Sequence, residues 1–303
     1  MDTSKTVIAT DETRLSESQR VFHSAGSRIV EWPRELEAGG ELLEELFDDG
    51  VGRVVIDGGD ELVGRVVTAY RRRRDLVGEA LEVWPLDVEN SYVARQAGTA
   101  IGPKRASTLL SKGGDDWQRQ QVGTLKVSAS TEPGAWYGFS FAVGWVYRAL
   151  ETRRRARGGA SNFVSAFGRL ASDTLNEADE TGVARRVAVD HQPTKVESGS
   201  LVVSTLAHTV FGLGGPGDGA VLWEQLPVSK LMRQAVTPEL LESGTEEGRP
   251  FDTVHLDSPD GWLLDGRLQG ADQPSVVQVT PGPTMTFVRP NTGLKAAVQR
   301  LWN

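Results

Sequence analysis

Residues 58–61, Gly-Gly-Asp-Glu, lie between a run that suits a strand and a run that suits a helix. A glycine turn that enters a helix exposes backbone N–H groups and the positive end of the helix dipole, which together can bind an anion. Gly58, Gly59 and Asp60 could therefore hold a phosphate group. The alternative is a tight turn with Asp60 as N-cap and Glu61 in the first helical turn. Taken alone, these residues favour the tight turn.

A second polar segment follows the next strand-like run. Residues 84–95 read Trp-Pro-Leu-Asp-Val-Glu-Asn-Ser-Tyr-Val-Ala-Arg, which places Asp87, Glu89 and Asn90 close behind the end of that run. The two segments are the strongest candidates for a functional site in the first half of the chain.

The elements around these segments alternate in type. Short β-branched and apolar runs predict strands at 5–10, 52–57 and 80–86. Apolar residues at helical spacing predict helices at 40–48, with Gly50 as a C-cap, and at 61–74. Strands alternating with helices at these lengths predict a parallel sheet covered by helices.

The second half of the chain changes character. Extended runs are predicted at 125–130, 135–144, 186–190, 195–197, 200–206, 219–226, 251–257, 261–269, 275–280 and 285–290, and helices at 162–176 and 292–302. Many short strands separated by Gly, Pro and Asp are typical of an antiparallel sandwich or barrel. We expect an α/β domain at 1–125 and a β-rich domain at 126–283.

Composition excludes several classes of function. The 303 residues suggest about two domains. The net charge of −8 disfavours a non-specific nucleic-acid binder, and the lack of cysteine excludes disulfides, thiolate zinc sites and cysteine nucleophiles. No signal peptide and no apolar stretch long enough to span a bilayer is visible, so we expect a cytoplasmic protein.

Two further patterns carry no chemistry. Residues 212–217 match G-x-G-x-x-G, but a strand-like run follows where a dinucleotide fingerprint needs a helix. The four histidines lack metal-ligand spacing, so no metal site is predicted.

Taken together, the two segments resemble the loops of the diacylglycerol kinase and sphingosine kinase family of lipid kinases. That family carries Gly-Gly-Asp-Gly-Thr after one strand and a Pro-Leu-Gly-Thr-Gly-Asn-Asp-Phe-Ala-Arg-like loop after the next. The residues here that match are Gly58, Gly59, Asp60, Pro85, Leu86, Asn90, Ala94 and Arg95. Weaker matches follow at 211–215, at Asp218-Gly219, at 264–267 (Leu-Asp-Gly-Arg) and at 286–290.

The resemblance implies a fold and a site. It implies an α/β nucleotide-binding-like domain at 1–125, a β-sandwich at 126–283 and a C-terminal segment, 284–303, that returns to the first domain. It also implies an active site between the two domains, with ATP and Mg²⁺ as cofactors, a lipid as substrate and possible homodimerisation.

The departures from the family pattern fall on the residues that would do the chemistry. Glu61 and Leu62 replace Gly and Thr in the first loop, and Asp87, Val88 and Glu89 replace Gly, Thr and Gly in the second. Two like charges about 4 Å apart repel by about 4 kcal/mol at an effective dielectric constant near 20, so these carboxylates oppose a bound phosphate.

The family residue implicated as the base is also replaced. Arg267 stands in its place, and a guanidinium cannot accept a proton. Asp265 remains, with a structural role by resemblance, while Gly217 aligns with the first Asp of the family's Asp-Asp-Gly segment.

We therefore expect a non-catalytic protein, a pseudokinase, that binds a lipid, another amphiphile or a protein partner, with ATP and Mg²⁺ as cofactors only under the kinase alternative. One alternative is an active ATP-dependent lipid or small-alcohol kinase with Asp60, Asp218 or Asp265 as base. Another is an assembly protein with an acidic N-terminal interface. Arginines at 71–74 and 153–157 could touch anionic lipid headgroups, but solvated helix ends are the expected role. The aromatic stretch from Trp136 to Tyr147 is expected in the sandwich core.

Overall fold

The computed structural model describes residues 5–77, 80–88, 91–112, 117–144, 146–148, 151, 186–194, 200–206, 220–226, 249–257, 259–270 and 275–291. Contacts divide the chain into two compact units, Met1–Val122 with Thr284–Asn303, and Gly123–Pro283. We expected the divisions after residues 125 and 283. The roles assigned to these parts, catalytic-like domain and sandwich domain, stay predictions.

The first unit contains a parallel sheet. Its strand order is β2-β1-β3-β4-β16, and every neighbouring pair is parallel. The predicted parallel sheet is therefore confirmed. Strand β5 begins in this unit and pairs with β16. The strand bounds are β1 Lys5–Thr10, β2 Arg28–Glu31, β3 Val51–Asp57, β4 Glu82–Pro85, β5 Trp117–Ala129 and β16 Val276–Pro290.

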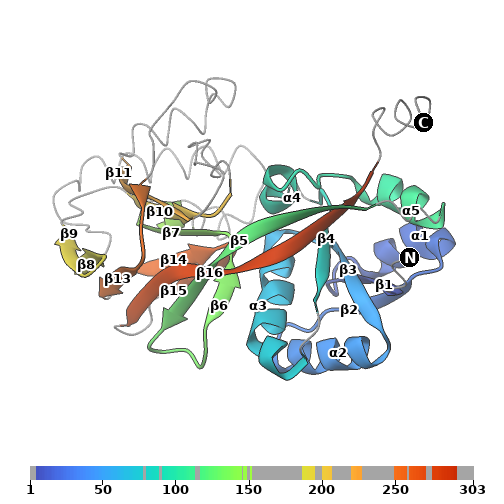
Figure 1. Ribbon diagram of the computed structural model, residues 1–303, viewed down its shortest axis with the longest axis horizontal. Helices are drawn as coiled ribbons and strands as arrows, with labels where there is room; N and C mark the ends of the chain where they lie inside the picture. Colours follow the sequence, from blue (N-terminus) through green and yellow to red (C-terminus); the bar gives the residue numbers. More distant parts are fainter. Residues whose placement is uncertain are drawn as a thin grey trace, which may run out of the picture. The chain divides into compact units, whose positions relative to one another are not determined.

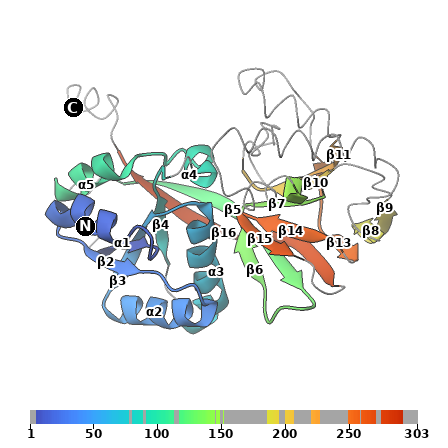
Figure 2. The same cartoon turned by 180° about the vertical axis from the view of Figure 1, so that it is seen from behind.

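Helices cover both faces of this sheet (Figures 1 and 2). Helices α1 and α5 pack together on one face, and α2 and α3 pack together on the other. Their bounds are α1 Leu15–Phe22, the 3₁₀ turn η1 His23–Ala25, α2 Leu36–Asp48, α3 Asp60–Val77, α4 Tyr92–Gln96 and α5 Pro103–Ser111.

The core under α1 and α5 follows from the alternation of side chains along a strand. Ile8, Val55 and Trp84 come from three neighbouring strands and pack with Phe22 of α1 and Ala106 of α5 in one buried cluster. Their sequence neighbours point to the opposite face because side chains alternate with a period of two. This packing holds the loops that follow β1, β3 and β4 at one edge of the sheet.

Helix α2 is longer than its predicted span of 40–48. It begins at Leu36 and runs through Gly39 and Gly40, two residues that weaken an isolated helix. A Cβ on Gly39 would lie 3.2 Å from Trp32 Nε1 and 3.6 Å from Ala69 Cβ of α3. The glycine thus allows close packing of α2 on α3, which sequence propensity alone does not indicate. Gly50 follows the helix with φ of 78°, as predicted.

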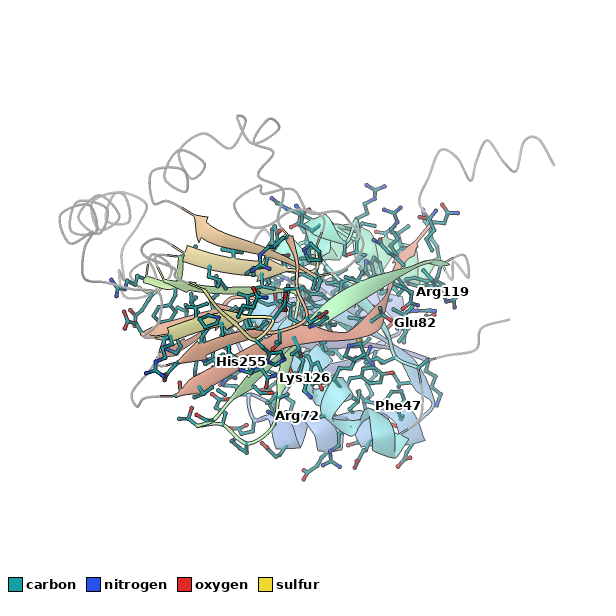
Figure 3. All side chains as sticks on the ribbon, turned by 60° about the vertical axis from the view of Figure 1, so that its left-hand side comes forward. Phe47, Arg72, Glu82, Arg119, Lys126 and His255 are labelled. Carbon is teal, nitrogen blue, oxygen red and sulfur yellow. The ribbon has the colours of Figure 1, made fainter. Side chains whose placement is uncertain are left out.

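A half-buried carboxylate connects β4 with β3 and β5. Glu82 accepts hydrogen bonds from Arg53 of β3 and Arg119 of β5, and Figure 3 labels the pair Glu82 and Arg119. The Arg53 guanidinium also lies 4.0 Å from the centre of the Trp117 ring. The Glu82 carboxylate is thus paired with two arginines within the sheet.

One expectation about the arginine run 71–74 is wrong. Arg71 is only 8% exposed, and it donates a hydrogen bond to the carbonyl oxygen of Thr284 in the returning strand β16. It therefore ties α3 to the C-terminal segment, where we expected a solvated helix end.

The second unit is antiparallel, as predicted. One sheet has the order β12-β11-β10-β7-β14-β15. In a second series the neighbours run β16-β13-β8-β9, and β5 pairs with β6. The bounds are β6 Trp136–Gly138, β7 Ser140–Gly144, β8 Arg186–Val189, β9 Gln192–Thr194, β10 Ser200–Ser204, β11 Val221–Leu226, β12 Arg249–Pro250, β13 Val254–Asp257, β14 Gly261–Leu264 and β15 Arg267–Gly270.

Several sequence predictions bear on this unit. In the aromatic stretch, Trp136, Phe139, Phe141 and Tyr147 are buried as expected, Tyr137 is half-buried, and Trp145 lies outside the described residues. The run 261–269 is divided by a turn at Asp265 into β14 and β15. The predicted helices at 162–176 and 292–302 and the strand at 195–197 lie outside the described residues. Within the described ranges, no helix is long and apolar enough to cross a membrane.

Candidate functional site

The strand order of the first unit places the ends of β1 and β3 side by side. From β1 the chain continues to β2 on one side, and from β3 it continues to β4 on the other. In open parallel sheets, ligands bind at the carboxyl ends of the strands where the order reverses in this way. The loops that follow β1, β3 and β4 therefore form the candidate site.

An ion pair of the chain itself joins β3 to the loop that follows β1. Arg14 Nη2 lies 3.2 Å from Asp57 Oδ1, and Ser18 Oγ donates to Asp57 Oδ2 at 2.5 Å. Thr10 Oγ1 adds a hydrogen bond of 3.1 Å to the Asp57 carbonyl oxygen. The Asp57 side chain is 0% exposed and that of Arg14 is 17% exposed. A polar network thus joins the ends of β1 and β3 at the switch point.

Asp11 orients Arg14 toward this network. The Arg14 backbone N–H donates to Asp11 Oδ1 at 3.2 Å and to the Asp11 carbonyl oxygen at 3.1 Å. An aspartate that binds the backbone a few residues on makes a local turn. The turn places Arg14 directly before α1. The sequence analysis did not predict the contact between Arg14, Ser18 and Asp57. The position of Asp57, directly after the apolar run Val54-Val55-Ile56, could have marked it as a residue at the carboxyl end of a strand.

Leu62 fills the space beside Gly58. A Cβ on Gly58 would overlap Leu62 Cδ2 and would lie 3.1 Å from Leu62 Cβ. The Leu62 side chain is 1% exposed, so it belongs to the core. Gly58 is therefore needed for the packing of Leu62. The space beside the Gly58 Cα is occupied by Leu62 and is not open to a ligand.

Asp60 binds the N-terminus of α4. Its Oδ1 accepts from Ser91 Oγ at 2.6 Å and from Val93 N at 3.1 Å, and its Oδ2 accepts from Tyr92 N at 3.0 Å. We predicted Asp60 as the N-cap of its own helix. Instead the Gly59 carbonyl oxygen accepts from Leu62 N and Val63 N in the first turn of α3, while the Asp60 carboxylate serves the neighbouring helix.

The pKa of Asp60 lies above its ordinary value. Burial raises it, the three hydrogen bonds to Ser91, Tyr92 and Val93 partly offset that effect, and the nearby Asp87 carboxylate raises it further. The two polar segments that the sequence singled out are therefore joined through one half-buried carboxylate.

The carboxylates expected to repel phosphate differ in their surroundings. Glu61 is exposed on the first turn of α3. Asp87 follows β4 and forms a bidentate pair with Arg95 of α4, at 3.3 Å and 3.4 Å. The charge of Asp87 is thus compensated within the chain. Glu89, Asn90 and Asp218 lie outside the described residues.

Asp265 and Arg267 lie in the second unit, in and after the turn between β14 and β15. Asp265 is buried with φ of 46°, and its two oxygens accept from Phe139 N at 2.8 Å and Ser140 N at 2.9 Å. It locks the turn onto β7, which is a structural role. The Arg267 guanidinium lies 3.3 Å from the centre of the Trp136 ring and 3.5 Å from Glu132 Oε1.

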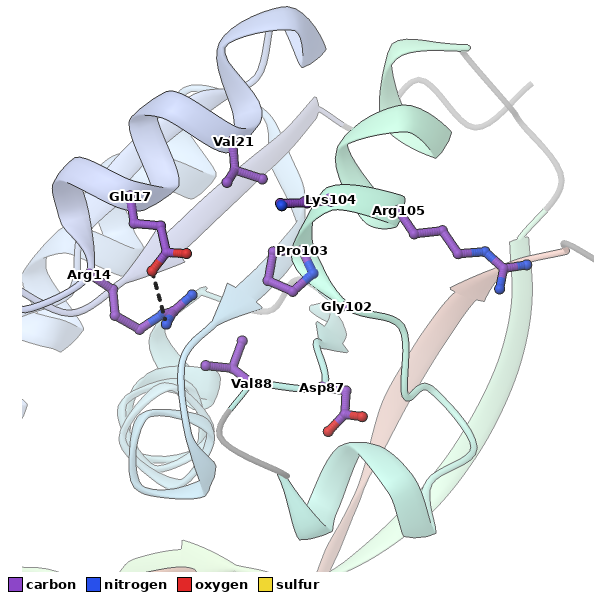
Figure 4. Close-up of a pocket in the computed structure, with 9 residues that line it drawn as sticks. All are labelled: Arg14, Glu17, Val21, Asp87, Val88, Gly102, Pro103, Lys104 and Arg105. Atoms are coloured by element: carbon purple, nitrogen blue, oxygen red, sulfur yellow. Dashed lines mark ion pairs between the residues drawn. The ribbon is translucent and has the colours of Figure 1, made fainter. Parts of the chain in front are cut away.

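A pocket of about 470 Å³ opens beside the Arg14 network in the first unit (Figure 4). Its walls are the start of α1, the loop after β4 and the first turn of α5. The lining residues are Arg14, Glu17, Val21, Asp87, Val88, Gly102, Pro103, Lys104 and Arg105. No group of three or more His, Asp or Glu side chains in the described part of the chain could hold a metal ion.

No protein-family model matches the chain, and no curated protein matches it in sequence. Solved structures match over nearly its whole length. A diacylglycerol kinase from Bacillus anthracis str. Sterne has a TM-score of 0.57 at 12% identity and covers 95% of this chain and 97% of its own.

Two further structures from the same organism, each assigned as a diacylglycerol kinase, have TM-scores of 0.60. One is 14% identical and covers 94% of each chain. The other is 13% identical and covers 97% of this chain and 100% of its own. The resemblance predicted from the sequence is confirmed at the level of the fold: this chain has a diacylglycerol-kinase-like fold.

Proposed function

We propose that this chain is a non-catalytic ligand-binding protein built on the diacylglycerol-kinase-like fold. The observation that carries the proposal is the Arg14–Asp57 ion pair at the ends of β1 and β3. A parallel sheet offers its ligand site at this position. Here the position is taken by side chains that satisfy one another.

The loops around this position support the proposal, because their described residues fit a nucleoside triphosphate such as ATP poorly. Leu62 packs against Gly58, and a phosphate needs close approach to a glycine backbone. The Asp60 carboxylate is used by the N-terminus of α4. Both groups therefore stabilise the fold at positions where the resemblance implies contact with ATP and Mg²⁺.

The position of the family base adds a further argument. Arg267 is held between the Trp136 ring and Glu132, and a guanidinium cannot take a proton from a hydroxyl group. Asp265 is committed to the amides of Phe139 and Ser140. Neither residue offers a base to an alcohol substrate.

Calorimetric titration of the full chain with ATP and with ADP, each with Mg²⁺, tests this proposal. We expect no saturable heat at micromolar nucleotide. A parallel assay with labelled ATP and a panel of lipids and small alcohols should yield no labelled product. Micromolar nucleotide affinity together with product formation would overturn the proposal.

A second candidate, an active kinase with a rearranged site, is favoured by two observations. Burial raises the pKa of Asp60, as is common for catalytic acids and bases, and Asp87 is neutralised by Arg95. In this scheme Asp60 would take the proton of the alcohol substrate. The alcohol oxygen would form a bond to the terminal phosphorus of ATP as the bond from that phosphorus to ADP breaks. Labelled product that disappears in Asp60→Asn, with Asp190→Asn as the matched control, would support this candidate.

A further inference from the structure

We propose that His191 and His255, both in the second unit, together bind one divalent transition-metal ion, with Cu²⁺ preferred. The inference goes beyond the function proposed above and uses no residue of the first unit. The spacing of the histidines along the sequence does not indicate a metal site. The antiparallel sheet nevertheless brings these two imidazole rings together.

The two rings are neighbours because the β8–β9 hairpin lies beside β13. Ala188 of β8 stands opposite His255 of β13, and His191 lies in the turn between β8 and β9. The ring centres are 6.0 Å apart and the ring planes are inclined by 37°. Bonds from a metal ion to imidazole nitrogen are about 2.0–2.1 Å long, so two imidazoles on one ion have ring centres about 5–6 Å apart. The observed separation therefore requires only a small rotation of either ring.

The turn holds His191 in an uncommon backbone conformation. Asp190 has φ of 51° and His191 has φ of 65°. A two-residue hairpin turn of type I′ needs positive φ at both positions, and glycine is the common residue at the second. A side chain at that position adds steric cost, since the Cβ approaches the following carbonyl oxygen. Such residues gather at functional sites, so the position points to a role for the His191 ring.

Hydrogen bonds fix this turn to the segment that carries the other ring. Asp190 Oδ1 accepts from Asp252 N at 2.7 Å and from Thr253 N at 3.0 Å, and Asp190 N donates to the Thr253 carbonyl oxygen at 2.9 Å. Asp190 directly precedes His191, and Thr253 comes two residues before His255. The two ligand-bearing segments are therefore held together in advance, and an ion that binds both rings orders little additional backbone.

The His255 ring lies on the outer face of its sheet. Val254 and Leu256 are both 0% exposed, so the alternation of side chains directs His255 to the opposite face. His255 is half-buried there and is labelled in Figure 3, while His191 is exposed. The residues opposite His255 on the neighbouring strands, Ala188 and Gln278, carry no charge. An ion can thus reach the two rings from solvent.

The charges on the turn, its flanking segments and the neighbouring strands balance one another. Among the described residues they are the carboxylates of Asp190, Asp252 and Asp257 and the cations of Arg186, Arg249 and, beyond β16, Lys126 of β5. A cation is therefore not attracted by an excess of negative charge, and affinity must come from the imidazole nitrogens. Nitrogen ligands favour Cu²⁺ over Ni²⁺ and Zn²⁺, whereas Mg²⁺ and Ca²⁺ prefer oxygen.

The remaining coordination positions fall to water. The described part of the chain offers no third His, Asp or Glu side chain to complete a closed set of protein ligands. Structural metal sites have four protein ligands, so a site with two imidazoles stays open to exchange. We therefore expect micromolar rather than nanomolar affinity.

Calorimetric titration of the untagged full chain with Cu²⁺, Ni²⁺, Zn²⁺ and Mg²⁺, in a buffer that does not chelate metals, tests the inference. We expect one saturable Cu²⁺ site, weaker binding of Ni²⁺ and Zn²⁺, and no saturable heat with Mg²⁺. The electron paramagnetic resonance spectrum of the Cu²⁺ complex should show splitting from nitrogen ligands. The chain has no cysteine, so no thiolate competes for the ion.

Two variants each remove one ring. His191→Asn keeps the turn, because asparagine tolerates positive φ, and His255→Gln keeps a polar side chain on β13. Each should weaken Cu²⁺ binding at least about tenfold, the loss typical even of a residue that only orients a ligand. His23→Asn is the matched control, since His23 is exposed in η1 of the first unit, and it should bind Cu²⁺ as the wild type does.

Three outcomes would overturn the inference: no saturable Cu²⁺ binding, unchanged binding in His191→Asn or His255→Gln, or an equal loss in His23→Asn. Mg²⁺ binding as tight as that of Cu²⁺ would also contradict it, because imidazole nitrogens would then not be the ligands. Nucleotide titrations report on the first unit, so this inference and the proposed function fail separately.

Discussion

The guanidinium of Arg14 and the carboxylate of Asp57 form an ion pair, 3.2 Å apart, between the loop after β1 and the end of β3. Asp57 has no contact with solvent, and its second oxygen accepts from Ser18. The pair lies at the part of the sheet edge where parallel folds bind ligands. A buried charge is costly without its partner, so this relationship makes a direct prediction.

Replacing Arg14 by Met leaves Asp57 buried without its cation. We expect the free energy of unfolding to fall by about 3 kcal/mol, measured by urea denaturation monitored by circular dichroism. The double variant Arg14→Met, Asp57→Leu should recover most of the loss, because an apolar pair can replace a buried ion pair.

Arg34→Met is the control for this variant. Arg34 pairs with Glu12 at 3.5 Å, and the two side chains are 74% and 71% exposed. Its loss should change the free energy of unfolding by less than about 0.5 kcal/mol. Equal losses in Arg14→Met and Arg34→Met would contradict a buried role for the Arg14–Asp57 pair.

Asp60 should make stability depend on pH in an unusual direction. Because the pKa of Asp60 is raised in the folded state, the folded chain keeps this proton to higher pH than the unfolded chain. The stabilisation from this titration is full below the unfolded pKa, about 3.9, and is lost as the pH rises through the folded pKa. The stability of the wild type relative to Asp60→Asn should therefore fall across this window in urea denaturation.

Asp190 should make stability depend on pH in the opposite direction. The backbone amides of Thr253 and Asp252 donate to its Oδ1 and lower its pKa, with a further contribution from Arg249. Its stabilisation should be present above the ordinary aspartate pKa and should be lost as the pH falls. The stability of the wild type relative to Asp190→Asn should then increase as the pH rises. Parallel trends for Asp60 and Asp190 would contradict these assignments.

Gly58 and Leu62 should couple in a double-mutant cycle. Gly58→Ala forces Leu62 out of its position in a packed core, and we expect a loss of about 1–3 kcal/mol. Leu62→Ala removes a fully buried side chain and should cost about 2–5 kcal/mol. The double variant should lose less than the sum, because the new methyl group occupies space vacated by Leu62. Strict additivity in thermal or urea unfolding would show that the two residues do not compete for the same space.

Arg267→Glu introduces the residue that the sequence resemblance implies at this position and tests whether a carboxylate alone brings activity. We expect no labelled product from ATP. We also expect a stability loss of about 2 kcal/mol, since a like charge would replace the cation 3.5 Å from Glu132.

Arg267→Lys keeps the positive charge and should lose less stability than Arg267→Glu, although it loses the planar contact with the Trp136 ring. Product formation by Arg267→Glu would contradict the view that several parts of the site are altered together.

Much of the fold could be predicted because its signals are local. The runs 5–10 and 52–57 match β1 and β3, and the apolar spacing in 61–74 lies within α3. Helices α1, α4 and α5 were missed. The five-residue α4 has a local N-cap, Ser91, whose side chain accepts from Ala94 N, but Asp60 adds hydrogen bonds to Tyr92 N and Val93 N across more than 30 residues of sequence. A helix this short depends on such tertiary contacts, which the local sequence does not show.

The candidate site was predicted less well, because residue type alone does not indicate which partner a charged group will find. Glu61 and Asp87 were expected to act together against phosphate, yet Asp87 pairs with Arg95 and Glu61 is exposed. Asp265 matches its expected structural role because a buried turn carboxylate has backbone amides close at hand.

The order of apolar runs, glycine turns and polar loop ends along the chain determined an α/β unit followed by antiparallel strands, since secondary structure follows from periodicity and turn chemistry. Only the tertiary structure decided that Asp57 meets Arg14, that Leu62 lies over Gly58 and that Arg14 and Lys104 line opposite walls of one pocket. These contacts arise when strands distant in sequence become neighbours and bury their charges, because a desolvated charge must take whichever partner the packing brings to it.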